Sequence, residues 1–192
     1  SGCPNLTSIV VPNGVSSIGL NAFEYCENLT SVTLPVGIKS IAAYAFYSCP
    51  KLANITLPDG LKSIGKFAFS GCTSLPNVVF PDSVTSIGEQ TFSYCESFTN
   101  ITISDSVTAM SYDAFAHCSN LTSVTIGRGL TSIARQAFAY CSNLTSVTIL
   151  GSVKTIGTYA FYNCSSLTSI TIPDSVTKIS QNAFSDCSSL AY

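Results

Sequence analysis

Nine cysteines recur at a constant spacing along this chain of 192 residues. Each step covers 26 − 3 = 23 residues without insertion or deletion, and the series is Cys3, Cys26, Cys49, Cys72, Cys95, Cys118, Cys141, Cys164 and Cys187. A fixed period of about 20 to 50 residues is typical of a solenoid, in which each repeat forms one coil that rests on the next. The spacing therefore predicts about eight 23-residue coils in a single solenoid domain over residues 1–192. Because the pattern is already under way at both ends, we expect the chain to be a fragment of a longer protein.

The first part of each repeat is typical of a strand followed by a turn. In the recurring stretch LTSVTI, we expect Leu121, Val124 and Ile126 to point inward and Ser123 and Thr125 outward, and Thr, Val and Ile favour strands. In several repeats Pro-Asp-Gly, Pro-Asn-Gly or Pro-Asp-Ser follows. These are turn sequences, because Pro fixes φ and Gly accepts positive φ.

The second part of each repeat returns the chain to the next cysteine. Ile18, Ala22 and Cys26 are spaced four residues apart, with Phe23 beside them. This spacing places apolar side chains on one face of an α- or 3-10 helix, so we expect one or two helical turns here.

The repeat consensus, C-x-x-L-x-x-I-x-I-P-x-x-V-x-x-I-G-x-x-A-F-x-x, is clearest in CSSLTSITIPDSVTKISQNAF at residues 164–184. It resembles the BspA-like leucine-rich repeats, and the resemblance covers the whole chain. The resemblance implies an α/β solenoid, a leucine-rich-repeat stack with a parallel β-sheet on the concave face and short helical or 3-10 turns on the return side. It also implies an extracellular location, because the family occurs in secreted or cell-surface proteins of microbes, including adhesins. Departures such as Phe98 for Leu and Met110 for Ile are expected to alter only local packing and turns.

Composition argues against two classes of partner. Eight Lys and Arg against ten Asp and Glu give a formal net charge of −2, so no basic stripe is available for nucleic acid. No apolar run approaches the ~18 residues of a membrane helix, and we expect no membrane insertion within this segment. The chain is 46% hydrophobic but only 9% charged, which predicts a well-buried interior under a polar, nearly uncharged surface.

The cysteines do not predict a metal site. Zinc needs several ligands in one small volume, whereas here one Cys occurs per coil and His117 is the single histidine. Disulfides between adjacent coils are disfavoured, because parallel side chains would hold the Cβ atoms ~4.8 Å apart, beyond the usual ~3.8 Å. We predict that the thiols are mostly reduced and buried, as small apolar residues at the start of each strand.

Catalysis and calcium binding have equally little support. His117 occupies the repeat position that holds Tyr25, Tyr94 and Tyr140 in other coils, so it is interpreted as a surface variant. A turn position could form a calcium ladder through Asp59, Asp82, Asp105 and Asp174, but Val36, Arg128 and Gly151 interrupt it. Pro-Asp-Gly as a turn sequence explains these residues as well. The chain is therefore predicted to be no enzyme and to have no catalytic residue, no cofactor and no metal.

The outward strand positions give the candidate binding surface. Repeat positions 6 and 8 carry small polar residues in most coils and are expected to cover the concave sheet. A row of amides beside one exposed apolar residue, at the centre of this sheet, offers polar pairing around an apolar point. The partner-binding residues predicted there are Asn54, Thr56, Asn77, Val79, Asn100 and Thr102. We expect a non-enzymatic recognition or adhesion module whose partner is a host or extracellular matrix protein.

Other functions stay open at this point. The strand positions are also consistent with a structural spacer that has a merely solvated surface. Carbohydrate is an alternative partner, because tyrosines gather around the return turn and exposed tyrosine is frequent in binding patches. The Thr row could order water as ice-binding proteins do, although a curved sheet would not match a crystal lattice.

Overall fold

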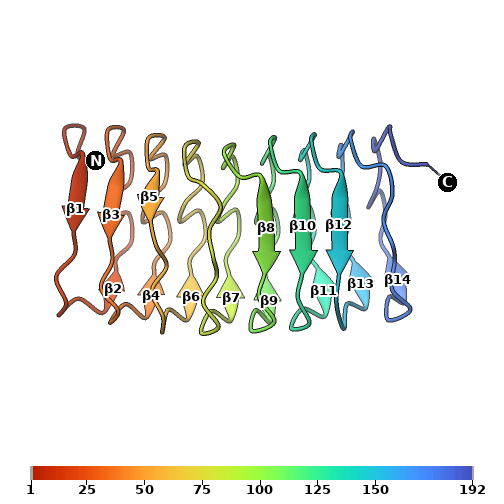
Figure 1. Ribbon diagram of the computed structural model, residues 1–192, viewed down its shortest axis with the longest axis horizontal. Coiled ribbons are helices and arrows are strands. Elements are labelled where there is room, and N and C mark those ends of the chain that lie inside the picture. Colours follow the sequence, from red (N-terminus) through yellow and green to blue (C-terminus); the bar gives the residue numbers. More distant parts are fainter. Residues whose placement is uncertain (1, 192) are drawn as a thin grey trace.

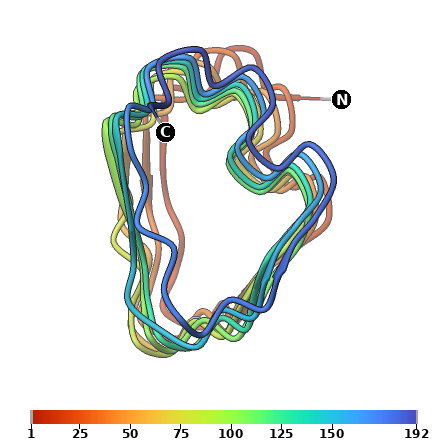
Figure 2. The same cartoon turned by 90° about the vertical axis from the view of Figure 1, so that its right-hand side faces the viewer.

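The computed structural model describes residues 2–191 as a long stack of similar coils. Figure 1 shows the coils side by side along one axis, with the two termini at opposite ends of the stack. Viewed end-on in Figure 2, successive coils follow nearly the same closed outline, which has one indentation.

The predicted strand forms in six of the repeats, although not at residues 77–80 or 168–172, and these six strands make two parallel sheets on the face turned toward the viewer in Figure 1. Partners are 23 residues apart: Val124 pairs with Ile101 on one side and with Val147 on the other. The sheets are β1 (Ser8–Val10), β3 (Ser31–Thr33) and β5 (Asn54–Ile55), and then β8 (Asn100–Ile103), β10 (Ser123–Ile126) and β12 (Ser146–Ile149). We call these six strands, with residues 77–80 between them, the strand face.

A second series of two-residue strands follows the turn in most coils and also pairs in parallel. Its first sheet contains β2 (Ser17–Ile18), β4 (Ser40–Ile41), β6 (Ser63–Ile64), β7 (Ser86–Ile87) and β9 (Ala109–Met110). The second contains β11 (Ser132–Ile133), β13 (Thr155–Ile156) and β14 (Lys178–Ile179). The return path therefore takes part in the backbone ladder as well.

The predicted helical turn is wrong, because no residue from 2 to 191 lies in a helix. Repeat positions 19 and 23 have positive φ in each complete coil, for example 56° at both Asn21 and Tyr25. A right-handed helix needs negative φ throughout, so these residues end each turn at once. The N–H of Ala22 donates to the carbonyl three residues earlier (3.3 Å), whereas that of Phe23 donates to Ala45 in the next coil (2.8 Å). The four-residue apolar spacing thus belongs to consecutive tight turns that bond to the neighbouring coil.

Two columns of identical residues fill the interior. The phenylalanine column, at repeat position 21 from Phe23 to Phe184, has neighbouring rings stacked with centroids 5.2 to 5.6 Å apart. In the cysteine column, each thiol from Cys49 to Cys187 donates to the carbonyl of the phenylalanine 26 residues earlier, at 3.0 to 3.3 Å. The repeat is therefore fixed by contacts between coils, as expected for a solenoid.

Candidate binding surface

The six residues predicted to bind a partner all lie exposed on the strand face. Asn54 belongs to β5, and Asn100 and Thr102 belong to β8. Val79 is 83% exposed, a large exposure for an aliphatic side chain. The structure thus gathers the predicted residues around one place, the coil that separates the two sheets.

Pro76 causes this separation of the two sheets. In neighbouring coils the N–H at this repeat position donates across the stack, as from Ala53 to the Thr30 carbonyl at 3.0 Å. Proline has no N–H, so this bond is missing and the ladder is interrupted. Within residues 2–191, no backbone–backbone hydrogen bond involves residues 77–80, and no strand is assigned to them.

Asn77 repairs part of the interruption with its side chain. Its Oδ1 accepts from the backbone N–H groups of Thr99 (2.8 Å) and Asn100 (3.1 Å), and its Nδ2 donates to the Thr99 hydroxyl (3.0 Å). In the next coil, where the ladder is regular, the backbone carbonyl of Thr99 accepts the equivalent bonds from the N–H groups of Thr122 and Ser123. The Asn77 amide therefore stands in for a backbone carbonyl, which gives this residue a structural task that the sequence did not reveal.

Two hollows flank the interruption. The first, of about 350 Å³, is lined by residues of β3 and β5 with Asn54, Thr56 and Pro76. The second, of about 360 Å³, is lined by residues 77–80 together with Asn100, Thr102 and Ser104. The six residues predicted from the sequence are part of this lining, but Pro76 was missed, although the strand-interrupting property of proline could have indicated it.

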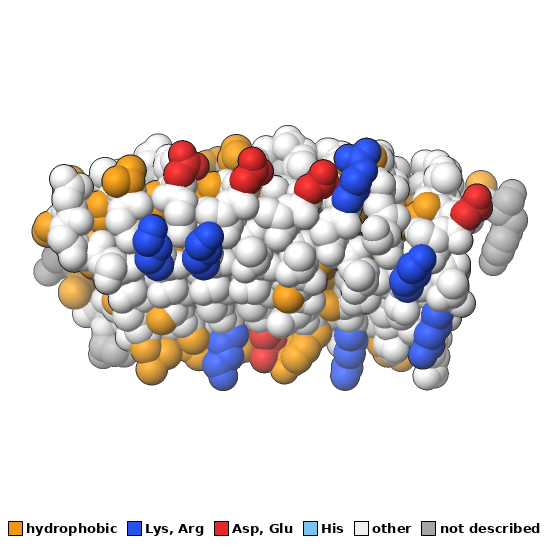
Figure 3. Space-filling view, turned by 90° about the horizontal axis from the view of Figure 1, so that it is seen from below, with side chains coloured by type: hydrophobic (Ala, Val, Ile, Leu, Met, Phe, Trp, Pro, Cys, Tyr) orange, Lys and Arg blue, Asp and Glu red, His pale blue; other side chains and the backbone are white. Residues whose placement is uncertain are grey.

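The edge below the strand face carries charges of both signs. Figure 3 views the stack from this side and shows a row of acidic side chains that a basic one interrupts. The Asp105 carboxylate accepts from the backbone N–H of Arg128 (2.6 Å), and its other oxygen lies 3.4 Å from the Arg128 guanidinium. Asp82 accepts from the Ser104 hydroxyl at 3.3 Å. These aspartates bond to the next coil, and no group of three potential metal ligands occurs among the described residues.

The interior holds the thiols from Cys26 to Cys164 in their protonated form. Eight of the nine cysteines are buried, as predicted, and Cys3 alone is exposed. Burial raises the pKa of Cys49 and of Cys141 to about 12. The pKa values of Cys72 and its neighbours in the column are also raised by burial. A thiolate nucleophile or metal ligand would need the opposite shift.

His117 lies in a stack of rings on the side of the return turns. Its ring is parallel to those of Tyr94 (4.3 Å) and Tyr140 (4.4 Å) in the adjacent coils. Partial burial there lowers the pKa of His117, which favours the neutral ring. The residue thus replaces tyrosine as one more stacked aromatic ring, in agreement with its interpretation as a variant of that position.

The coils and their parallel ladders define a leucine-rich-repeat solenoid. The chain belongs to the BspA type leucine rich repeat family, whose model matches residues 1–87 and 63–191. The resemblance found in the sequence is therefore confirmed. Among curated proteins, no sequence matches this chain. No helix long and apolar enough to cross a membrane occurs in the described part of the chain.

Solved structures of bacterial proteins have the same fold. A leucine-rich repeat protein from Bacteroides ovatus is 32% identical with a TM-score of 0.84, and the match covers 88% of this chain and 46% of that one. A T. pallidum leucine rich repeat protein is 33% identical with a TM-score of 0.79, over 88% of this chain and 79% of that one. A leucine rich cell surface protein from Faecalibacterium prausnitzii is 28% identical with a TM-score of 0.63, over 98% and 59%. The chain thus spans about half the length of the Bacteroides ovatus protein.

Proposed function

We propose that the chain is a non-enzymatic recognition module of a secreted or cell-surface protein, and that it binds a host or extracellular matrix protein through the strand face. The observation that carries this proposal is the coil at residues 77–80, which has no backbone hydrogen bonds to its neighbours and presents Val79 at 83% exposure.

Unpaired main-chain groups favour a polypeptide partner. β5 pairs only with β3, and β8 pairs on its other side with β10, so the strand edges that face residues 77–80 have no ladder partner. The peptide groups of residues 77–80 make no backbone–backbone bond within residues 2–191, and a partner can supply donors and acceptors to them. A polypeptide offers both kinds of group in series, as when a segment adds to an open sheet edge.

The side chains around residues 77–80 suit contact with another protein. An exposed valine with a hollow beside it is an apolar point, and Asn100 and Thr102 offer amide and hydroxyl groups at its margin. None of these side chains is charged, which matches the depletion of charge at the centre of protein interfaces. Similarity to a cell surface protein of Faecalibacterium prausnitzii supports the extracellular location.

The proposal can be tested by surface plasmon resonance on immobilised fibronectin, laminin and collagen. Val79→Asp places a charge at the apolar point, and we expect it to weaken binding to a responsive protein at least tenfold. Thr148→Asp is the matched control, because it changes the same repeat position in β12, away from the interruption. Asn77→Ala is unsuitable as a binding probe, since it removes bonds to Thr99 and Asn100.

Two results would count against the proposal. Equal binding by Val79→Asp and the parent chain would exclude the centre of the strand face as the contact. Absence of binding to every matrix protein offered would favour a structural spacer, the function that needs no partner.

A further inference from the structure

A second surface is built by the residues at repeat position 23, which we call the outer column. Each lies directly before a cysteine and has positive φ, from 53° at Ser48 to 77° at Gly71. The column runs Tyr25, Ser48, Gly71, Tyr94, His117, Tyr140, Asn163 and Asp186. Since all share one backbone conformation at one pitch, rings at successive positions stack, as those of Tyr94, His117 and Tyr140 do.

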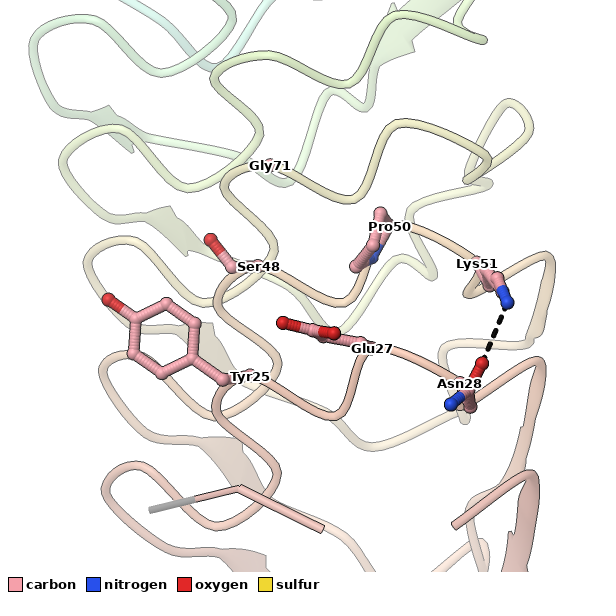
Figure 4. A pocket seen from close by; sticks show the side chains of 7 residues that line it. All are labelled: Tyr25, Glu27, Asn28, Ser48, Pro50, Lys51 and Gly71. Carbon is pink, nitrogen blue, oxygen red and sulfur yellow. Dashed lines mark hydrogen bonds between the residues drawn. The ribbon is translucent and has the colours of Figure 1, made fainter. Parts of the chain in front are cut away.

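Two successive coils lack a ring in this column. Ser48 and Gly71 stand between Tyr25 and Tyr94, and a hollow of about 460 Å³ opens over them. Tyr25 is 44% exposed and forms its aromatic wall, and Pro50 lies on the opposite side of the hollow (Figure 4). The volume lies in the range of about 300 to 1,000 Å³ that small-ligand pockets have.

Polar groups converge on the same hollow. Figure 4 shows the Glu27 side chain directed into the space between Tyr25 and Pro50. Its carboxylate makes no hydrogen bond or ion pair to any residue between 2 and 191, whereas Asn28 and Lys51, which line the same hollow, bond to each other. Both oxygens of Glu27 are therefore free to accept hydrogen bonds from a ligand.

The basic side of the hollow is held in place by a short chain of bonds. The Lys51 ammonium donates to Asn28 Oδ1 at 2.7 Å, and Asn28 Nδ2 donates to the Pro4 carbonyl at 2.6 Å. Figure 4 shows Lys51 turned toward Asn28 at the margin of the hollow, away from Tyr25. One carboxylate and one ammonium make the lining neutral in sum.

We infer that this hollow binds a neutral pyranose sugar, with the sugar ring against Tyr25 and neighbouring hydroxyls donating to Glu27. A sugar ring has an apolar C–H face that suits the face of an aromatic side chain, and hydroxyls that suit a carboxylate. An apolar ligand would bury the Glu27 carboxylate without a donor, which is costly. A phosphate or carboxylate ligand would meet the like charge of Glu27.

The outer column supplies a substitution that closes the hollow without disturbing the fold. Ser48→Tyr introduces a ring at a φ of 53°, close to the 59° and 62° at which Tyr94 and Tyr140 already carry rings. The new ring is expected to stack on Tyr25 as neighbouring rings do elsewhere in the column. Asn163→Tyr is the matched control, because it adds the same ring at the same repeat position (φ 55°), outside the hollow.

The probes are the methyl glycosides of glucose, galactose, mannose and N-acetylglucosamine, titrated into the isotope-labelled chain and followed by NMR. We expect at least one glycoside to shift the backbone signals of Tyr25, Ser48 and Gly71. Ser48→Tyr should abolish these shifts, and Glu27→Gln should weaken the affinity at least fivefold. Asn163→Tyr should leave the affinity unchanged.

Two outcomes would overturn the inference. One is that no glycoside shifts signals of the hollow; the other is that Ser48→Tyr binds as the parent chain does. Neither bears on the proposed protein contact, because Val79 and the strand face are unchanged in these variants.

Discussion

The phenylalanine column and the outer column are only two residues apart in every coil, yet they differ sharply in composition. The inner column repeats one residue from Phe23 to Phe184, and its rings stack without a gap. The outer column stacks rings over three coils, from Tyr94 to Tyr140, and holds serine and glycine where the hollow opens.

Burial explains the difference. Phe115 is fully buried between Phe92 and Phe138, so a smaller residue would leave a cavity and a larger one would not fit. His117, in the same coil, has solvent on one side, so ring, amide and hydroxyl side chains all fit at its repeat position. Repeat positions whose side chains are fixed by buried stacking keep one residue type, and this regularity reveals the fold. Partly exposed repeat positions can differ between coils and so can form binding sites.

The contribution of the buried interior to stability should depend on pH far more than the contribution of the outer surface does. An unfolded thiol has a pKa near 9.0, whereas folding raises those of Cys49 and Cys141 to about 12. The folded state therefore keeps protons that the unfolded state loses. The stability that each of these two thiols contributes is fully present below pH 9 and falls between pH 9 and 12, by about 1.4 kcal/mol for each pH unit.

Guanidinium unfolding at pH 8, 9 and 10 would measure this fall. Cys72→Ala together with Cys95→Ala is the control, because removal of two buried thiols should flatten the dependence by their share. A midpoint that stays constant from pH 8 to 10 would contradict the expectation.

A single ring removed from the inner column should cost the next largest amount. Phe115 stacks on Phe92 at 5.3 Å and on Phe138 at 5.5 Å. Phe115→Ala is expected to lower the free energy of unfolding by about 3 to 5 kcal/mol, since a buried cavity replaces the ring. Chemical denaturation followed by circular dichroism would measure the loss, and a loss under about 1 kcal/mol would mean that the column carries little of the stability.

The matched change in the outer column should have the smallest effect. His117→Ala removes a ring that lies 4.3 and 4.4 Å from its neighbours but is partly exposed. We expect a loss of about 0.5 to 1.5 kcal/mol, the usual worth of aromatic pairs, under the same denaturation conditions. A loss equal to that of Phe115→Ala would remove the distinction between the two columns.

Sequence periodicity was sufficient to predict the strand, its register and the interior. Cysteine spacing alone fixes which residues pair, because Val124 must face the residue 23 positions before it and the one 23 positions after it. For the return path, the same periodicity led to the wrong prediction of a helical turn. Spacing by four is shared by a helix and by successive tight turns, and only the positive φ at positions such as Asn21 and Tyr25 separates them.

The candidate sites were predicted less completely. The exposed strand residues were found from alternation, but the replacement of a backbone carbonyl by the Asn77 amide depends on a geometry that no sequence pattern states. Thiol bonds to phenylalanine carbonyls were missed for the same reason. The hollow beside Tyr25 did leave a signal, because Ser48 and Gly71 interrupt a run of aromatic residues at one repeat position.

Contacts restricted to adjacent coils have a consequence for the gene. The coil from Cys118 to Tyr140 lies between two coils that pair with it in the same way, so duplication or loss of this unit leaves the remaining coils with equivalent neighbours. The coding sequence can therefore change length here in steps of 23 × 3 = 69 nucleotides while the sheets keep their register. A shorter insertion would shift phenylalanine against cysteine in the stack. Recombination between such similar units is expected to lengthen or shorten the molecule by about 4.8 Å per event, without a new fold having to evolve.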